Sequence, residues 1–283
     1  MKEAVLKAAL DAGFVRARIL APWMPPAGAA ANYREGAPAL LMAALAYGNR
    51  APGAVSGAPP GTAEIAPFAQ RNYYRETVKR LQRLSGEFRQ RFGGQKRDFR
   101  ILCNSPVPEK PPAAACGLGA LGRNGLIICP EAGSLVVIAA MTLPWALSGD
   151  GPLEGSPCAA CNPQNPPCAA ACPTGALAVD GSFHREWCIQ WYASGYGETV
   201  PPEVAAQWGR RFYGCNLCQD ACIWHQKPIP GAETAEGILP AWIDCRELLA
   251  LSDEAIRARF RGTALGLSWL SPQALRRNAE MAL

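Results

Sequence analysis

The apolar positions in the first half of the chain follow two kinds of spacing. A period near 3.6 residues is typical of a helix with one buried face, and alternation or a short continuous apolar run is typical of a strand. Helices are predicted at residues 2–12, 68–92 and 113–121. Strands are predicted at residues 14–20, 37–47, 99–103, 126–129 and 134–142. The run at 37–47 is also compatible with a buried helix. This alternation of helices and strands indicates a layered domain of α/β or α+β type.

Segments rich in glycine and proline divide the chain further. Residues 51–66 are predicted to be a surface loop, and residues 148–157 a linker. Cysteines are concentrated between residues 158 and 230, and the pattern after residue 240 is helical. We therefore expect three consecutive domains, at 1–150, 151–232 and 233–283.

Composition and charge exclude some classes of protein. With 283 residues, 49% hydrophobic and 18% charged, the chain is typical of a folded globular protein rather than a disordered one. Acidic residues interrupt the apolar N-terminal segment, and no uncharged apolar run reaches about 18 residues. We expect a soluble, cytoplasmic monomer without a membrane partner. The net charge of +5 permits a polyanionic partner but does not require one, and the basic residues at 71–100 and 257–277 are interpreted as solvated helix faces.

Eight of the twelve cysteines form one ordered series. Its segments are Cys158-x2-Cys161-x6-Cys168-x3-Cys172-Pro173, then Cys188, then Cys215-x2-Cys218-x3-Cys222. Two [4Fe–4S] clusters need eight thiolates, and C-x2-C units with a final C-x3-C-P are typical of two-cluster ferredoxins. In those proteins one cysteine of each run ligates the other cluster. The spacing then predicts one cluster on Cys158, Cys161, Cys168 and Cys222, and a second on Cys172, Cys188, Cys215 and Cys218.

Two other uses of these cysteines remain open. Paired C-x2-C units also suit a structural zinc site, although the C-x3-C-P ending and the total of eight favour clusters. A disulfide framework is disfavoured, because the chain has no secretory signal and is long enough to form its own core. The gap between Cys161 and Cys168 holds six residues where ferredoxins usually hold two, and this polar NPQNPP loop is expected to bulge outward.

A glycine-rich segment at residues 117–122 matches the formal pattern G-x-G-x-x-G. A dinucleotide fingerprint needs a strand before it, a helix after it and an acidic residue about 20 positions later, and none is present. The glycines suit close approach to another large planar ligand, or tight packing. The two histidines, His184 and His225, lie in the cysteine-rich segment and are interpreted as surface residues. Because the histidine-containing corrinoid motif D-x-H-x-x-G is absent, any corrinoid would bind without a histidine axial ligand.

Several motifs together resemble the epoxyqueuosine reductase family, which reduces an epoxide on a modified tRNA base with cobalamin and two [4Fe–4S] clusters. The similarity covers roughly residues 68–281. Besides the cysteine series and Tyr213-Gly214 just before Cys215, the matching segments are 71–74, 106–110, 117–124, 133–134, 258–265 and 275–278. The resemblance implies an α+β fold, with an N-terminal α/β-layer domain of cobalamin-binding type, a bacterial two-[4Fe–4S] ferredoxin-like domain and a short helical tail.

The resemblance also implies cofactors, partners and contacts. Electrons from a low-potential donor of flavodoxin or ferredoxin type would pass through the two clusters to a corrinoid. The corrinoid would lie against the 117–124 turn, and tRNA is a possible substrate. The contacts to the corrinoid would come from Gly119, Gly122, Asn124, Ser134 and Asn216.

The chain departs from the family pattern at the position of the catalytic acid. The family's aspartate in D-S-A-P-V-L-E-R corresponds to Cys103, and Asn72-Tyr73-Tyr74 replaces its Asp-Tyr-His. A thiol is a poor proton donor, so Glu109 or Tyr74 is the alternative acid. The chain also stops at Leu283, where family members often continue into helical repeats. Three activities stay open: a reductase of the epoxyqueuosine type, a corrinoid reductase of another substrate such as the reductive dehalogenases, and a cobalamin-free electron-transfer protein.

Overall fold

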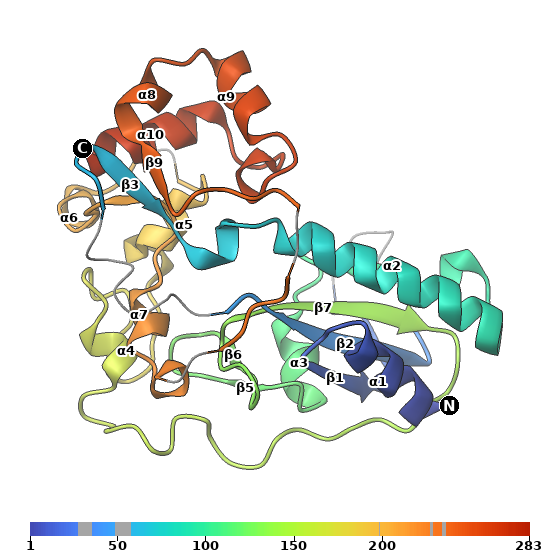
Figure 1. Cartoon of the computed structure of the whole chain (residues 1–283). Helices are drawn as coiled ribbons and strands as arrows, with labels where there is room; N and C mark the ends of the chain where they lie inside the picture. Colours follow the sequence, from blue (N-terminus) through green and yellow to red (C-terminus); the bar gives the residue numbers. More distant parts are fainter. Residues whose placement is uncertain (28–35, 49–57, 198, 227–228, 234–235) are drawn as a thin grey trace. The chain divides into compact units, whose positions relative to one another are not determined.

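The computed structural model describes residues 1–27, 36–48, 58–197, 199–226, 229–233 and 236–283. The chain forms two compact units (Figure 1). The first unit contains Met1–Gly48, Tyr74–Ala160 and Ile229–Ala232. The second contains Asn49–Tyr73, Cys161–Pro228 and Glu233–Leu283.

A four-stranded antiparallel sheet is the centre of the first unit. Its strand order is β1-β2-β7-β4. The strands are β1 (Arg16–Leu20), β2 (Ala39–Ala46), β7 (Val136–Leu143) and β4 (Ile101–Leu102). All eight residues of β2 are buried, which explains its continuous apolar run, since an internal strand covered on both faces needs no polar alternation. The strand prediction for this segment is confirmed, and the helical alternative is wrong.

Two helices pack beside this sheet. Helix α1 (Lys2–Asp11) precedes β1, and helix α2 (Tyr73–Phe92) supplies Phe88 and Phe92, whose rings lie 6.5 and 5.7 Å from the ring of Trp145 just after β7. Arg80 of α2 is buried, and its Nη1 donates to the carbonyls of Ala12 and Gly13 at 2.9 and 3.1 Å. The solvated face expected for the basic residues at 71–100 therefore does not include Arg80, which holds α2 to the end of α1.

The glycine-rich segment forms a hairpin rather than the continuation of a helix. Helix α3 spans Lys110–Ala115, and the hairpin pairs β5 (Ala120–Leu121) with β6 (Ile127–Ile128). The helix predicted at 113–121 is thus wrong beyond Ala115. Gly117 has φ of +67°, a left-handed conformation that ends a helix, and a Cβ there would lie 2.5 Å from the carbonyl oxygen of Gly151.

The hydroxyl of Thr142 fixes the edge strand β4 to β7. It donates to the carbonyl of Asp98 at 2.6 Å and accepts from the backbone N–H of Arg100 at 2.7 Å, and the residue is 1% exposed. Thr142→Val keeps the shape but removes both of these buried hydrogen bonds, so we expect a loss of about 1–3 kcal/mol in the free energy of unfolding. Denaturant titration measures it. Thr142→Ser, which keeps the hydroxyl, should lose clearly less, and equal losses for the two variants would contradict the assignment.

The second unit has a three-stranded mixed sheet of order β8-β3-β9. Its strands are β3 (Thr62–Ile65), β8 (Arg211–Tyr213) and β9 (Trp242–Asp244). Strand β3 runs parallel to β8 and antiparallel to β9. The surface loop predicted at 51–66 is therefore wrong for Thr62–Ile65, which buries Ala63 and Ile65 and takes the central place in the sheet. Residues 51–57 lie outside the described residues.

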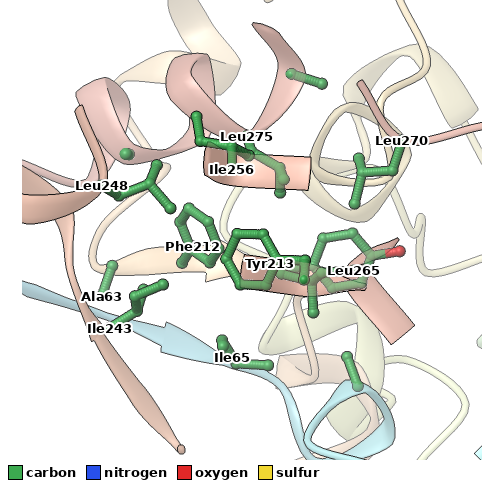
Figure 2. Packing of buried hydrophobic residues seen from close by; sticks show 14 of the residues in the cluster. Ala63, Ile65, Phe212, Tyr213, Ile243, Leu248, Ile256, Leu265, Leu270 and Leu275 are labelled. Atoms are coloured by element: carbon green, nitrogen blue, oxygen red, sulfur yellow. The ribbon is translucent and has the colours of Figure 1, made fainter. Parts of the chain in front are cut away.

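The C-terminal segment covers this sheet with helices. These are α8 (Cys245–Leu249), α9 (Asp253–Phe260) and α10 (Pro272–Ala282). The hydroxyls of Ser252 and Ser271 accept hydrogen bonds from the first turns of α9 and α10 and so define where both helices begin. Figure 2 shows Leu248, Ile256 and Leu275 around Phe212 of β8. The helical tail is confirmed except for β9, whose three residues were too few to show a strand pattern.

The remaining helical structure consists of short helices and 3-10 turns. In the second unit the α-helical ones are α4 (Pro167–Ala170), α5 (Ile189–Ala193), α6 (Pro202–Ala205) and α7 (Leu217–Asp220). The 3-10 turns are η2 (Pro67–Ala69), η4 (Arg185–Trp187), η5 (Ile223–His225) and η6 (Ala264–Gly266), with η3 (Lys96–Asp98) in the first unit. No helix among the described residues has the length and apolar character needed to cross a bilayer.

The mixed α+β class is confirmed, but the division of the chain differs from three consecutive domains. The cysteine-rich segment and the C-terminal helices share one unit, because β3 and β9 pair in one sheet and a common core lies behind it. Strand β3 comes from the range 1–150 that the sequence pattern predicts as a single N-terminal domain.

Candidate iron–sulfur and cofactor site

The two C-x3-C segments have the same local structure. Cys168 lies in α4 and Cys218 in α7, and each short helix is followed by the next cysteine of the series. The N–H of Cys172 donates to the carbonyl of Ala169 at 3.0 Å, and the N–H of Cys222 donates to that of Gln219 at 2.9 Å. Helices α4 and α7 pack against each other (Figure 1). The mirrored spacing in the sequence therefore corresponds to two similar turns placed side by side.

Four thiols assigned by spacing to one cluster lie within electrostatic range of one another. Burial raises the pKa of the Cys218 thiol, and the neighbouring Cys215, Cys188 and Cys172 raise it further. Burial also raises the pKa of Cys188 and of Cys215, and Cys172 adds to both. Cys168, assigned to the other cluster, makes the smallest contribution at Cys218. Three separate segments thus bring this set together, and mutual repulsion of thiolates is relieved when a cationic iron cluster binds them.

Hydrogen-bond donors lie beside this set of sulfurs. Cys188 immediately precedes α5, and the backbone N–H groups of Trp191 and Gln190 lower its pKa against the effect of burial. The positive charge of Arg211 and the N–H of Leu217 act in the same direction on Cys215. Donors of this kind favour the thiolate, which is the form that ligates iron.

Cys158 lies in the first unit, while the other seven cysteines of the series lie in the second. Its sulfur accepts a hydrogen bond from the backbone N–H of Arg123 at 3.4 Å, and its own N–H donates to Ser156 Oγ at 3.2 Å. The six-residue gap before Cys168 contains a turn, in which Asn162 Oδ1 accepts from the N–H of Gln164 at 3.0 Å. Residues 162–165 are exposed, in agreement with a loop that bulges outward.

All twelve cysteines belong to the described residues, and none of them takes part in a disulfide. Cys116, Cys129 and Cys245 are buried among apolar side chains and are core residues. Among the described residues, no three His, Cys, Asp or Glu side chains converge closely enough to hold a single metal ion. The donor set itself, eight thiols in ferredoxin order with Cys172, Cys188 and Cys215 all acting on Cys218, fits iron–sulfur clusters.

Packing within the hairpin constrains two of the predicted cofactor glycines. A Cβ on Gly119 would lie 2.5 Å from Ile127 Cγ2, and one on Gly122 would lie 2.6 Å from Ile128 Cδ1. A Cβ on Gly119 would also lie 2.7 Å from the carbonyl oxygen of Ile128, so this position needs glycine for the hairpin to close, whatever ligand it meets, whereas the close atoms at Gly122 belong to side chains. Ser134 is buried next to the turn that follows β6.

Two predicted cofactor residues carry buried polar atoms without a hydrogen-bond partner. Asn124 Oδ1 accepts from the N–H of Leu126 at 3.2 Å, but its Nδ2 is unpaired, and so is Oδ1 of Asn216. Both residues are less than 10% exposed. An unpaired buried amide costs free energy, so each of these groups is suited to a polar ligand such as the amide-bearing edge of a corrinoid.

The residue at the position of the family's acid is a buried thiol. Burial raises the pKa of Cys103 to about 12, and the carboxylate of Glu109 adds to the shift. The pKa of Glu109 is raised as well, chiefly by burial, although its Oε1 accepts the N–H of Ser105 at 3.1 Å. Asn104 between them has φ of +49°. Cys103 and Glu109 therefore lie together, whereas Tyr74 lies on a different element, in the first turn of α2.

Three residues make contacts in the fold that the sequence did not predict. The side chain of Asn72 donates to the carbonyl of Gly262 at 2.9 Å, which joins two segments that match the family. Arg211 and the peptide of Arg123 act on cluster cysteines through folded-state contacts that no motif shows. His225 is a correction: it is buried, its Nδ1 lies 2.5 Å from the carbonyl of Gln219, and burial lowers its pKa.

Comparison with known proteins gives one consistent family. No family model matches the chain. The epoxyqueuosine reductase of Bacillus subtilis is 31% identical over 185 residues, which is 62% of this chain and 44% of that protein. The chain thus spans less than half the length of this curated relative.

Solved structures show the same fold. The epoxyqueuosine reductase of Streptococcus thermophilus superposes with a TM-score of 0.81 at 19% identity, covering 100% of this chain and 80% of that one. An epoxyqueuosine reductase with an epoxyqueuosine-modified tRNA stem loop superposes with a TM-score of 0.78 at 22% identity, covering the same shares. The chain is thus similar in sequence to part of the epoxyqueuosine reductases and shares their fold.

Proposed function

We propose that this protein is an iron–sulfur oxidoreductase of the epoxyqueuosine reductase type. The observation that supports it most is the gathering of Cys172, Cys188, Cys215 and Cys218 from three segments of a chain whose relatives carry that name. This set would hold one [4Fe–4S] cluster. Cys158, Cys161, Cys168 and Cys222 would hold the other, as the ferredoxin spacing predicts.

The clusters would supply electron transfer, and a corrinoid would supply the reactive metal centre. The chain's own groups would bind the corrinoid and set the charge state of the cluster sulfurs. The Nδ2 of Asn124 and the Oδ1 of Asn216, both buried and unpaired, would each gain a partner from the corrinoid. Arg211 favours the thiolate form of Cys215, and the N–H groups of Gln190 and Trp191 favour that of Cys188, against burial, which raises both pKa values.

The proposed substrate is an epoxide on a modified tRNA base. A relative with the same fold holds an epoxyqueuosine-modified tRNA stem loop. The net charge of +5 is compatible with a polyanion and does not by itself indicate one. The electron donor would be a low-potential protein of flavodoxin or ferredoxin type.

A second candidate is a cobalamin-free electron-transfer protein on the same scaffold. The thiol of Cys103 favours it, because a group with a pKa of about 12 delivers a proton poorly at neutral pH. The unpaired amide groups of Asn124 and Asn216 favour the corrinoid enzyme instead.

Anaerobic reconstitution followed by a corrinoid titration separates the candidates. The enzyme should take up about eight irons and eight sulfides per chain. Cob(II)alamin should then bind in a base-off form without a histidine ligand, visible as a change in its EPR spectrum. Asn124→Ala should weaken this binding, because it removes one of the polar groups offered to the ligand.

The possible outcomes distinguish the two candidate functions. Clusters with cob(II)alamin bound support the reductase. Clusters without binding at about 100 μM cofactor (roughly −5.5 kcal/mol) support electron transfer alone. About one zinc per chain and no acid-labile sulfide would contradict both.

A further inference from the structure

A backbone hydrogen bond joins the glycine-rich hairpin to a cluster cysteine. The N–H of Arg123 donates to Cys158 Sγ at 3.4 Å, a normal distance for a sulfur acceptor, across 35 positions of the chain. Both residues lie in the first unit. The donor is a peptide group, so this contact depends on the path of the backbone and not on the side chain at position 123.

The turn between β5 and β6 holds this peptide in place. The N–H of Gly122 donates to the carbonyl of Leu126 at 2.8 Å, and the N–H of Gly125 donates back to the carbonyl of Gly122 at 2.9 Å. Asn124 Oδ1 accepts the N–H of Leu126 at 3.2 Å. These bonds close residues 122–126 into one turn, in which the N–H of Arg123 points outward to Cys158.

A second polar group of the same turn is buried and unpaired. It is Nδ2 of Asn124, which belongs to the residue next to the Arg123 peptide. The two neighbouring residues therefore carry two donors: the N–H of Arg123, which donates to a cluster cysteine, and Nδ2 of Asn124, which has no acceptor within the protein. A ligand that accepts a hydrogen bond from Asn124 Nδ2 therefore contacts the same turn that carries the hydrogen bond to Cys158.

We propose that the N–H of Arg123 sets the reduction potential of the cluster that Cys158 ligates, and that it couples this potential to occupation of the Asn124 side of the turn. The proposal rests on the proposed function for the presence of the cluster. A donor to a ligating sulfur stabilises the reduced, more negative state and so raises the potential. By linkage, a ligand that changes the potential must bind the oxidised and reduced protein with different affinities.

The test compares Arg123→Pro with Arg123→Ala in the full chain after anaerobic reconstitution. Both variants lose the arginine side chain, but only proline lacks the N–H. Gly122 has no Cβ and therefore tolerates a following proline. In a potentiometric titration followed by EPR, Arg123→Pro should shift one cluster to lower potential than in Arg123→Ala, and the other cluster should not move.

The coupling is measured with cob(II)alamin as the probe. We expect its addition to shift the potential of the same cluster in Arg123→Ala and to shift it less in Arg123→Pro. Equal potentials in the two variants, with iron content intact, would overturn the tuning role. Equal shifts on adding cob(II)alamin would overturn the coupling.

A measurement on the unmodified chain keeps the proposal testable if the proline variant does not fold. Protein labelled with ¹⁵N at the α-nitrogen of its arginines should show ¹⁵N coupling to a reduced cluster in pulsed EPR, and Arg123→Ala labelled in the same way should lose that coupling. Absence of the coupling would contradict the hydrogen bond. Failure of the unmodified chain to take up iron is seen first in metal analysis and counts against the proposed function itself.

Discussion

Cys172→Ser is expected to remove one iron–sulfur cluster and leave the other intact. Cys172 is close in sequence to Cys168, yet its electrostatic neighbours in the fold are Cys188, Cys215 and Cys218. A cubane that loses one of four thiolate ligands is strongly destabilised, so iron should fall from about eight to about four per chain. Cys222→Ser should give the same iron content through loss of the other cluster.

EPR of the dithionite-reduced variants distinguishes the two clusters. Each variant should keep a single cluster signal, and the two signals should differ, because different clusters survive. Cys245→Ser is the matched control: this cysteine is buried in the core of the same unit, outside both ligand sets, and its replacement should leave about eight irons. If Cys172→Ser and Cys222→Ser lose the same signal, the exchange of ligands between the two runs is wrong.

The elements that could be predicted from the sequence are those with a strong local pattern. Strand β2 was predictable because eight consecutive buried apolar residues leave few alternatives. Strand β3 was not, because Thr62–Ile65 follows a glycine- and proline-rich stretch and is a strand only through its pairing with β8 and β9. Helix α3 ends early for a similar reason, since a left-handed Gly117 is required by packing against Gly151.

The residues of the candidate site also form two groups, one that the sequence predicts and one that only the fold shows. Metal-ligand spacing is a local property, so the cysteine series was visible in the sequence. Arg123 and Asn72 act through partners 35 and 190 positions away, and a backbone donor such as the N–H of Arg123 has no residue type to recognise. Arg211 lies close to Cys215 in the sequence, but its effect on that thiol belongs to no motif. Buried His225 was misassigned because burial comes from the tertiary fold, which the sequence around it does not show.

Cys103→Asp is expected to raise epoxyqueuosine reduction on tRNA, by about 10²–10⁴-fold, the usual contribution of a general acid. Removing an epoxide oxygen as water requires protons as well as electrons. The native thiol supplies them poorly, since burial and Glu109 raise its pKa to about 12. An aspartate in the same place would also lie beside the Glu109 carboxylate, whose negative charge would raise the aspartate's pKa and keep more of it protonated near neutral pH.

The assay measures conversion of an epoxyqueuosine-containing tRNA stem loop by the reconstituted protein with a chemical reductant. Cys103→Asn is the matched control, because it has the size of aspartate without an acidic proton, and it should stay at the native level. The rate of Cys103→Asp should fall as the pH rises through the pKa of the new carboxyl group, while the native protein shows no such limb. Robust native turnover that is unchanged by Cys103→Ala would show that another residue, with Glu109 the nearest carboxyl group, delivers the proton.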